Sequence, residues 1–183
     1  MSQFNKEDIL RLFHLLNDEM TAESLEGEVY LVGGAVMCLV FNARPSTKDV
    51  DAFFKPAQKM REAAAKVAAK TGIQPDWLND AVKGFFSKQG EYEIFLNLSH
   101  LRVFVAKAEY LLAMKCLAMR IGEEFHDVDD VQYLIRYLNL RTYQQTLDVI
   151  TPYYPLERFP QKNALRAGRN SGKGIKGRRL TSF

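Results

Sequence analysis

The sequence is poor in the side chains that most often bind transition metals or form disulfides, with three histidines and two cysteines among 183 residues. Cys38 and Cys116 each lie in an apolar stretch expected to be helical, which is more typical of buried free thiols than of a disulfide or a metal-binding pair. No run of about 18 apolar residues is present, so the sequence predicts no membrane-spanning helix. Residues 1–7 lack the apolar core of a signal peptide, and we therefore expect a cytoplasmic protein.

Acidic residues are missing from the end of the chain. Residues 164–183 contain six of the 25 basic residues and none of the 22 acidic ones, so the rest of the chain is slightly acidic. Glycine, serine and basic residues together are typical of a flexible arm that binds nucleic-acid phosphates, or of a disordered end that only aids solubility. We favour RNA binding for this tail.

The remaining composition, 47% hydrophobic and 26% charged, is that of an ordinary globular protein with a sizeable core. Helical periodicities and short β-rich runs predict an α/β (α+β) fold, with a small mixed sheet flanked by helices and a helical C-terminal lobe. We expect a core over residues 1–105, the lobe over 106–160 and a basic, flexible tail over 161–183. The predicted helices cover residues 5–20, 35–41, 57–70, 108–121, 127–138 and 143–150, and the predicted strands cover residues 28–32, 50–54, 91–98 and 101–105.

The most specific pattern in the sequence lies within residues 29–54. An apolar strand ends in Gly33-Gly34, a short helical stretch follows, and a second strand contains Asp49-x-Asp51. Alternate residues of a strand point to the same face, so the two carboxylates should lie side by side. Both strands are expected to present their carboxyl ends at one edge of the sheet.

Two adjacent carboxylates repel each other, and a common reason for such a pair is a divalent cation. Mg²⁺, or Mn²⁺, is usually held by one or two carboxylates together with substrate phosphates. Glycines let the backbone approach a phosphate closely, and the start of the following helix favours an anion. Asp49 and Asp51 are thus candidate metal ligands, and Gly33 and Gly34 are candidate phosphate-binding residues. The alternative for the aspartates is an exposed edge strand whose charges face solvent.

The Gly33-Gly34 pair followed by Asp49-x-Asp51 resembles the signature of the DNA polymerase β-like nucleotidyltransferase superfamily, in its small single-domain form. The longer segment Arg44-x-x-Thr47-Lys48-Asp49-Val50-Asp51 more closely resembles bacterial abortive-infection nucleotidyltransferase toxins and their uncharacterised relatives. The resemblance covers roughly residues 25–140. It implies the nucleotidyltransferase fold and metal-dependent transfer of NMP from an NTP to an acceptor hydroxyl.

Arg44, Thr47 and Lys48 are candidate nucleotide-binding residues of the same segment. Beside a phosphate site the two cations would offset triphosphate charge, and Thr47 would donate a hydrogen bond. Equally, the cations could be ordinary surface residues, and the hydroxyl could only stabilise the turn. The resemblance also implies a third carboxylate from a later strand. The candidates for that carboxylate are Asp76, Asp80, Glu91 and Glu93.

Lys115 is the single charge within the apolar segment Leu111–Met119. Two interpretations stay open: its stem snorkels past apolar neighbours, or its ammonium reaches nucleotide phosphates. The toxin-type resemblance includes such a lysine before an Asp-rich helix start, which favours the second interpretation and makes Lys115 a candidate catalytic residue. Asp127 and Asp130 share a face of that next helix, where they would cap it, order Lys115 or act on the incoming hydroxyl.

The acceptor implied by the toxin-type resemblance is RNA, tRNA in particular, and the implied partner is a cognate antitoxin protein. Two rival functions stay open. One is nucleotidyl transfer to a small molecule, such as an aminoglycoside, or to a protein side chain. The other is a non-catalytic module that binds nucleotide, RNA or an antitoxin.

Overall fold

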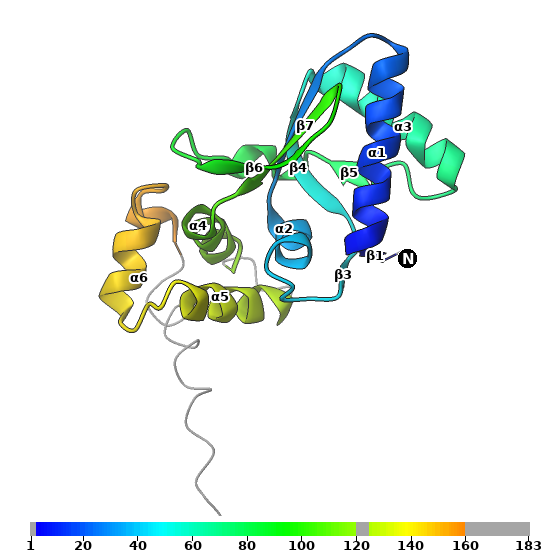
Figure 1. Cartoon of the computed structure of the whole chain (residues 1–183). Helices are drawn as coiled ribbons and strands as arrows, with labels where there is room; N and C mark the ends of the chain where they lie inside the picture. Colours follow the sequence, from blue (N-terminus) through cyan, green and yellow to red (C-terminus); the bar gives the residue numbers. More distant parts are fainter. Residues whose placement is uncertain (1–2, 120–124, 160–183) are drawn as a thin grey trace, which may run out of the picture.

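The computed structural model describes residues 3–119 and 125–159 of the chain. Helices and short strands alternate along it (Figure 1), which confirms the predicted mixed α/β composition. The helices are α1 (Lys6–Ala22), α2 (Gly33–Leu39), α3 (Ala57–Thr71), α4 (Ala108–Ala118), α5 (Phe125–Tyr137) and α6 (Tyr143–Ile150), with 3-10 helices η1 (Ala81–Phe85) and η3 (Leu156–Arg158). The strands are β1 (Phe4–Asn5), β2 (Gly27–Leu31), β3 (Ser46–Thr47), β4 (Val50–Lys55), β5 (Leu78–Asn79), β6 (Tyr92–Asn97) and β7 (Leu101–Ala106).

Five strands form one mixed sheet in the order β5-β4-β2-β7-β6, and β1 and β3 form a separate antiparallel pair. The central strand β2 is antiparallel to β4 and parallel to β7. The strands predicted over residues 91–98 and 101–105 are present as the antiparallel β6–β7 hairpin, and the short β5 runs parallel to β4 at the other edge. Buried and half-buried residues alternate along β2 and through most of β4, so one face of these strands points into the core.

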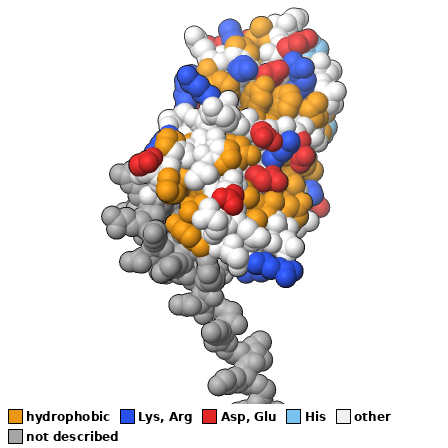
Figure 2. Space-filling view, turned by 90° about the vertical axis from the view of Figure 1, so that its left-hand side faces the viewer, with side chains coloured by type: hydrophobic (Ala, Val, Ile, Leu, Met, Phe, Trp, Pro, Cys, Tyr) orange, Lys and Arg blue, Asp and Glu red, His pale blue; other side chains and the backbone are white. Residues whose placement is uncertain are grey.

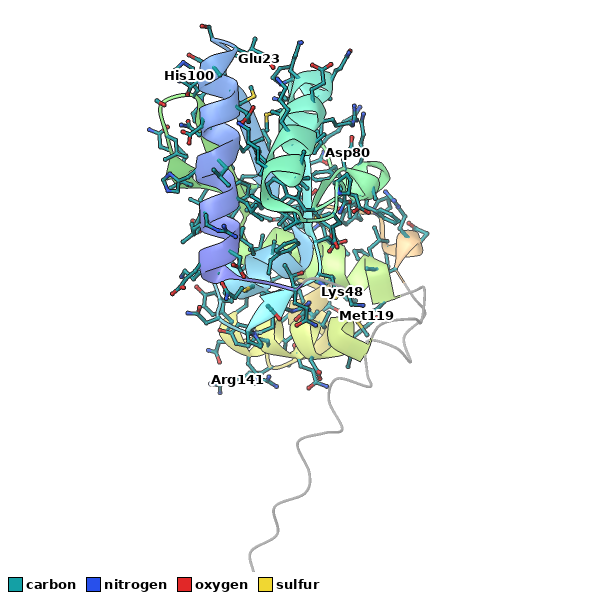
Figure 3. The ribbon with its side chains drawn as sticks, turned by 90° about the vertical axis from the view of Figure 1, so that its right-hand side faces the viewer. Glu23, Lys48, Asp80, His100, Met119 and Arg141 are labelled. Atoms are coloured by element: carbon teal, nitrogen blue, oxygen red, sulfur yellow. The ribbon has the colours of Figure 1, made fainter. Side chains whose placement is uncertain are left out.

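Helices α1 and α3 lie side by side against one face of the sheet (Figure 1, Figure 3). A capping box begins α1: the Asn5 side chain accepts from the backbone N–H of Asp8, and the Asp8 carboxylate accepts from the N–H of Asn5. α3 ends at Gly72, whose φ of 71° is common for a glycine at a helix C-terminus. The apolar stripe predicted for the first helix is buried: Ile9, Leu12, Phe13, Leu16 and Met20.

The single tryptophan anchors the segment between α3 and β6, a region that the sequence left undefined. Trp77 is fully buried, and its indole N–H donates to the carbonyl of Ala64 over 3.1 Å. Its backbone carbonyl accepts from the N–H of Val50 over 2.7 Å, which places β5 beside β4. The following η1 packs against β4.

The C-terminal helices extend the same hydrophobic core. Tyr110 and Leu111 of α4 are completely buried. The buried cluster continues into α5 through Leu134 and into α6 through Ile150. The helix predicted over residues 143–150 is confirmed with the same bounds, and a capping box at Thr142 begins it.

Two predictions concern parts of the chain that the structure does not describe. The end of the long apolar helix near residue 121 and the basic tail 161–183 lie outside the described residues. Among the helices of residues 3–119 and 125–159, none is both long enough and apolar enough to cross a membrane.

The relative direction of β2 and β4 corrects one expectation. The idea that both strands present their carboxyl ends at one edge is wrong, because the strands are antiparallel and Leu31 pairs with Ala52. The carboxyl end of β2 therefore meets the amino end of β4, and the N–H of Val32 donates to the carbonyl of Asp51 over 3.1 Å. The glycines that follow β2 and the aspartates at the start of β4 still meet at this edge.

Candidate functional site

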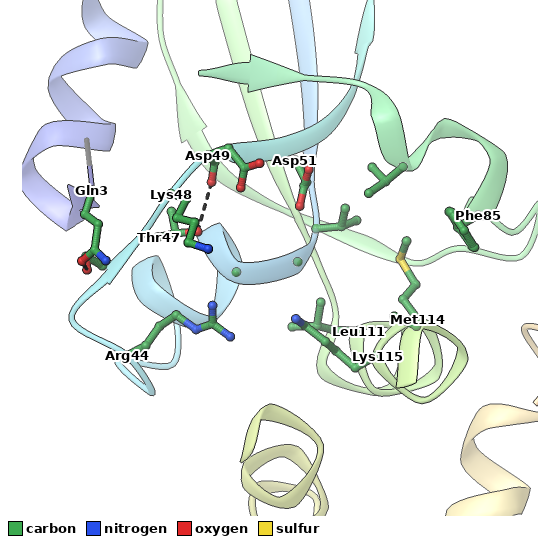
Figure 4. Close-up of a pocket in the computed structure, with 16 residues that line it drawn as sticks. Gln3, Arg44, Thr47, Lys48, Asp49, Asp51, Phe85, Leu111, Met114 and Lys115 are labelled. Atoms are coloured by element: carbon green, nitrogen blue, oxygen red, sulfur yellow. Dashed lines mark hydrogen bonds between the residues drawn. The ribbon is translucent and has the colours of Figure 1, made fainter. Parts of the chain in front are cut away.

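A pocket of about 340 Å³ lies where the end of β2, the start of β4, η1 and α4 meet (Figure 4). It contains all the catalytic and nucleotide-binding candidates named from the sequence, which are Gly33, Gly34, Arg44, Thr47, Lys48, Asp49, Asp51 and Lys115. The other lining residues are Gln3, Val32, Ser46, Val82, Phe85, Leu111, Met114 and Ala118. Charged and polar groups thus share one cavity with an apolar wall.

Asp49 and Asp51 both line the pocket, but only Asp51 belongs to the strand. β4 begins at Val50, and Asp49 occupies the bend just before it. The Thr47 hydroxyl donates to the backbone carbonyl of Asp49 over 3.1 Å, so Thr47 stabilises this bend. Both aspartates are half-buried and face the cavity. Two adjacent carboxylates suit Mg²⁺ or Mn²⁺, which takes its other ligands from water and phosphate oxygens.

Asn79 of β5 contacts the aspartate pair from the neighbouring strand, where it is in register with Asp51. Its amide nitrogen lies 3.4 Å from a carboxylate oxygen of Asp49, to which it donates. Its amide oxygen accepts from the N–H of Ala81 over 3.1 Å. The second hydrogen bond fixes the amide so that its nitrogen faces Asp49. Asn79 had no signal in the sequence, because β5 is only two residues long.

Gly33 and Gly34 are the first two residues of α2, and a Cβ at either position would press on a neighbouring pocket side chain. Gly33 has a φ of 65°, and a Cβ there would lie 3.0 Å from a carboxylate oxygen of Asp51. A Cβ on Gly34 would lie 2.8 Å from the Thr47 hydroxyl and 2.9 Å from a guanidinium nitrogen of Arg44. Glycine therefore allows the turn, the carboxylate and the guanidinium to approach one another.

Asp130 joins two cations of the pocket. Its carboxylate forms ion pairs with Arg44 and, over 2.8 Å, with the ammonium of Lys115. Asp130 and Lys115 are buried, with 4% and 8% of their surfaces exposed. In Figure 4 the side chains of Arg44 and Lys115 point toward the start of α2 from the side opposite to the pocket aspartates. The contact links α4, α5 and the loop before β3.

The contact predicted between Asp130 and Lys115 is therefore present, and Lys115 does not snorkel to the protein surface. Burial alone would raise the pKa of the Asp130 carboxyl, but the hydrogen bond from Arg44 and the charge of Lys115 outweigh it and hold the pKa below its ordinary value. Asp130 is thus ionised at neutral pH. The side chain of Asp127, the other candidate on α5, lies outside the described residues.

The other acidic candidates with described side chains do not line the pocket. Asp80 begins η1 and pairs with Arg61 of α3, and Glu93 is exposed on the edge strand β6. Asp76 and Glu91 are exposed as well. Within the part of the chain that the structure describes, no group of three or more acidic, histidine or cysteine side chains could bind a metal ion. The third carboxylate implied by the resemblance is not found there.

The sequence predicts one part of the pocket's apolar wall, the part that α4 supplies, and gives no indication of the part that η1 supplies. Val82 and Phe85 come from η1, whose five residues show no recognisable periodicity. Leu111, Met114 and Ala118 come from α4, and together with Lys115 they follow the spacing of one helix face. This spacing predicts a helix face that points inward or along the wall of a cleft, and the pocket confirms it.

In comparisons with family models, curated proteins and solved structures, the chain matches none of them. The structure therefore defines a class in general terms: a mixed α/β protein with a five-stranded mixed sheet and a charged pocket at one edge of that sheet. The resemblance to nucleotidyltransferases depends on Gly33-Gly34, Asp49-x-Asp51 and the surrounding segment.

Proposed function

We propose that the protein is a cytoplasmic, metal-dependent nucleotidyltransferase that moves an NMP group from an NTP to a hydroxyl of RNA, tRNA in particular. The main support is that Gly33, Gly34, Asp49 and Asp51 meet in one pocket that also contains basic side chains. A metal-bound triphosphate requires both features, because carboxylates bind the metal and cations offset the phosphate charge. The proposal includes action as the toxin of a toxin–antitoxin pair, with a cognate antitoxin protein as partner.

In this mechanism Asp49 and Asp51 hold the metal ion. When bound, Mg²⁺ or Mn²⁺ supplies positive charge that stabilises the attacking and leaving oxygens. One carboxylate of the pair accepts the proton of the acceptor hydroxyl as that oxygen attacks the α-phosphorus. The bond between the α-phosphorus and the bridging oxygen of the β-phosphate breaks, and pyrophosphate leaves. Asn79 keeps Asp49 oriented through its 3.4 Å hydrogen bond.

Arg44 and Lys115 offset the charge of the triphosphate, and the exposed Lys48 adds a third cation at the pocket. Asp130 orders Arg44 and Lys115 before the nucleotide binds, which reduces the entropy lost on binding. Positioning and charge stabilisation then supply most of the rate.

The direct test is to incubate the protein with each α-labelled NTP, Mg²⁺ or Mn²⁺, and total RNA. We expect label to appear in RNA with at least one NTP and to disappear when the metal is chelated. Absence of labelled RNA with every NTP and either metal would contradict the proposal.

The turn at Gly34 gives a specific prediction for nucleotide binding. We expect Gly34→Ala to weaken ATP binding by about tenfold, roughly the loss of one charge-assisted hydrogen bond, because the new methyl group displaces the Thr47 hydroxyl and the end of the Arg44 side chain. Isothermal titration calorimetry measures the change. Gly84→Ala is the matched control, because a Cβ at Gly84 meets nothing within 4 Å. Equal weakening in both variants would show that the close approach at Gly34 has no special role in nucleotide binding.

Deleting residues 164–183 distinguishes an RNA acceptor from a small-molecule acceptor. The deletion removes six basic residues, and each lost phosphate contact reduces the slope of log affinity against log salt by roughly 0.7–0.9. We expect weaker RNA binding with a shallower salt dependence and unchanged ATP binding. The small-molecule acceptor would be favoured if the deletion left RNA affinity unchanged and the protein transferred label to an aminoglycoside.

One observation favours a second candidate function, a non-catalytic module that binds nucleotide or RNA. In the described part of the pocket only Asp49 and Asp51 are acidic, and the side chain beside them on β5 is the neutral Asn79. Under this alternative ATP binds to the pocket, but no label reaches any acceptor. The assay with labelled NTPs separates the two candidates.

A further inference from the structure

The sheet face opposite α1 and α3 has a row of large apolar side chains across it. Residues paired directly across neighbouring strands point to the same face. Phe53 of β4 pairs with Tyr30 of β2. Tyr30 also pairs with Phe104 of β7, which pairs in turn with Ile94 of β6. These four residues, called the Tyr30 row, cross four strands over about 14 Å, since neighbouring strands lie about 4.8 Å apart.

The Tyr30 row is accessible to solvent. Its three aromatic residues are half-buried, and Ile94 is 62% exposed, which is high for a large apolar side chain. The rings of Tyr30 and Phe104 are nearly parallel with centroids 4.7 Å apart, and the Phe53 ring lies 5.9 Å from that of Tyr30. Figure 2 views the molecule from this side and shows hydrophobic side chains gathered beside basic and acidic ones.

A row of charged and polar side chains runs alongside the Tyr30 row. This second row, called the Glu28 row, pairs across the same four strands and consists of Lys55, Glu28, Arg102 and Asn97. Glu28 forms ion pairs with Lys55 and Arg102 and accepts a hydrogen bond from Tyr30. The ammonium of Lys55 also lies 5.2 Å from the centroid of the Tyr30 ring. Two cations with one carboxylate between them give this row a net positive charge.

Two consecutive phenylalanines connect the Tyr30 row to the pocket. Phe85 lines the pocket and is 38% exposed. The next residue, Phe86, packs on Phe53 with ring centroids 5.8 Å apart. Along β4, Asp51 and Phe53 share a face and are about 7 Å apart, the length of two residues of a strand. The aromatic surface therefore leads to the aspartate pair.

We propose that the Tyr30 row binds single-stranded RNA and directs its terminal hydroxyl into the pocket, an inference that rests on the proposed function of that pocket. Unpaired bases stack on accessible aromatic side chains with little dependence on sequence. The length of the row suits about two or three bases. Phosphates between these bases contact Lys55 and Arg102, while the carboxylate of Glu28 limits the electrostatic part of the affinity. Duplex RNA cannot bind in this way, because its bases are paired and stacked.

The features of this face favour a nucleic acid over a protein as its occupant. The core of a protein interface is depleted of charged residues. Here the charged Glu28 row borders the aromatic row directly. The row also ends beside the candidate nucleotide site, where an acceptor strand has to arrive.

Fluorescence anisotropy of the full chain with a short labelled single-stranded RNA tests the proposal. We expect Phe104→Ala to weaken binding by about tenfold, the usual effect of losing one base–aromatic stack. Ile94→Glu should weaken it as well, and the exposed position of Ile94 tolerates a charge. Glu28→Gln should tighten binding, because it removes the carboxylate between two cations. Tyr137→Ala is the matched control, because Tyr137 is 60% exposed on α5 and lies outside the Tyr30 row. This variant should bind the RNA with the affinity of the wild type.

Salt titration separates stacking on the row from phosphate binding by the tail. Stacking releases no counterions, so Phe104→Ala should leave the slope of log affinity against log salt unchanged. Circular dichroism checks that each variant is folded. If Phe104→Ala unfolds, the RNA affinities of the two separate variants Ile94→Glu and Glu28→Gln test the proposal instead. Three results would overturn the proposal. They are wild-type RNA affinity in Ile94→Glu, a loss of RNA affinity in Tyr137→Ala equal to that in Phe104→Ala, and tighter binding of duplex RNA than of single-stranded RNA.

Label transfer distinguishes failure of this inference from failure of the proposed function. RNA binding that depends on the Tyr30 row, with no transfer to RNA, would refute the transferase and leave the RNA surface standing. Transfer that depends on Asp49 and Asp51, with an unchanged KM for RNA in Ile94→Glu, would support the transferase and overturn the RNA surface.

Discussion

Replacing both pocket aspartates, Asp49→Asn with Asp51→Asn, is expected to lower label transfer from NTP to RNA by roughly 10³-fold or more. Metal binding supplies several kcal/mol of transition-state stabilisation, and about 1.4 kcal/mol corresponds to a tenfold change in rate. An amide keeps the shape of each side chain but has no charge, so metal affinity is lost while packing is retained. Single-turnover assays at several Mg²⁺ concentrations measure the loss.

Fold stability shows whether this loss is one of chemistry or of structure. Asparagine has the size and shape of aspartate, so the double variant should stay folded, and urea denaturation checks this. Asp80→Asn is the matched control, because Asp80 pairs with Arg61 outside the pocket and should transfer label at the wild-type rate. Transfer that survives the double substitution would refute the site, and so would an equal loss in Asp80→Asn.

A second large effect, on stability, is expected for Asp130→Asn. The substitution removes the buried carboxylate that joins Arg44 and Lys115, whose side chains are 19% and 10% exposed. Breaking a buried ion pair by removing one partner costs about 3–5 kcal/mol. We expect the free energy of unfolding, measured by urea denaturation, to fall by about 3 kcal/mol. Asp129→Asn, at the exposed neighbouring position, should change it by about 0.5 kcal/mol at most.

The same carboxylate makes stability depend on pH. Burial would raise the pKa of Asp130, but pairing with Arg44 and Lys115 outweighs burial and lowers it in the folded protein. A carboxyl with a lowered folded pKa stabilises the protein above its unfolded pKa and loses this contribution as the pH falls through the folded pKa. The stability difference between wild type and Asp130→Asn should therefore be constant near neutrality and shrink below about pH 4. A difference that grew on acidification would contradict the assignment.

The parts of the fold that depend on neighbouring residues could be predicted from the sequence. Asn5 and Asp8 are three residues apart, and their reciprocal capping follows from that spacing. Both Asp49 and Asp51 line the pocket as predicted, but the two-residue period of a strand accounts only for Asp51, because Asp49 lies in the bend before β4. The helices over residues 57–71 and 143–150 follow from periodicity and from the residues that end them.

The contacts that the sequence did not reveal join distant parts of the chain. Arg44 and Asp130 are separated by 86 residues, and neither position indicates the other. The direction of β4 relative to β2 depends on how the chain returns after α2, which local spacing does not determine. Asn79 reaches Asp49 only because Trp77 fixes a two-residue strand beside β4.

The position of Trp77 beside the pocket aspartates suggests a use for its intrinsic fluorescence. It is the single tryptophan, so all indole emission comes from one position. Its carbonyl is bonded to the N–H of Val50, the residue between the two aspartates, and its ring lies against that of Phe13 in the core. A shift of β4 on binding of metal or nucleotide would act on Trp77 through this hydrogen bond, so we expect intrinsic fluorescence to report occupancy of the pocket without an attached dye.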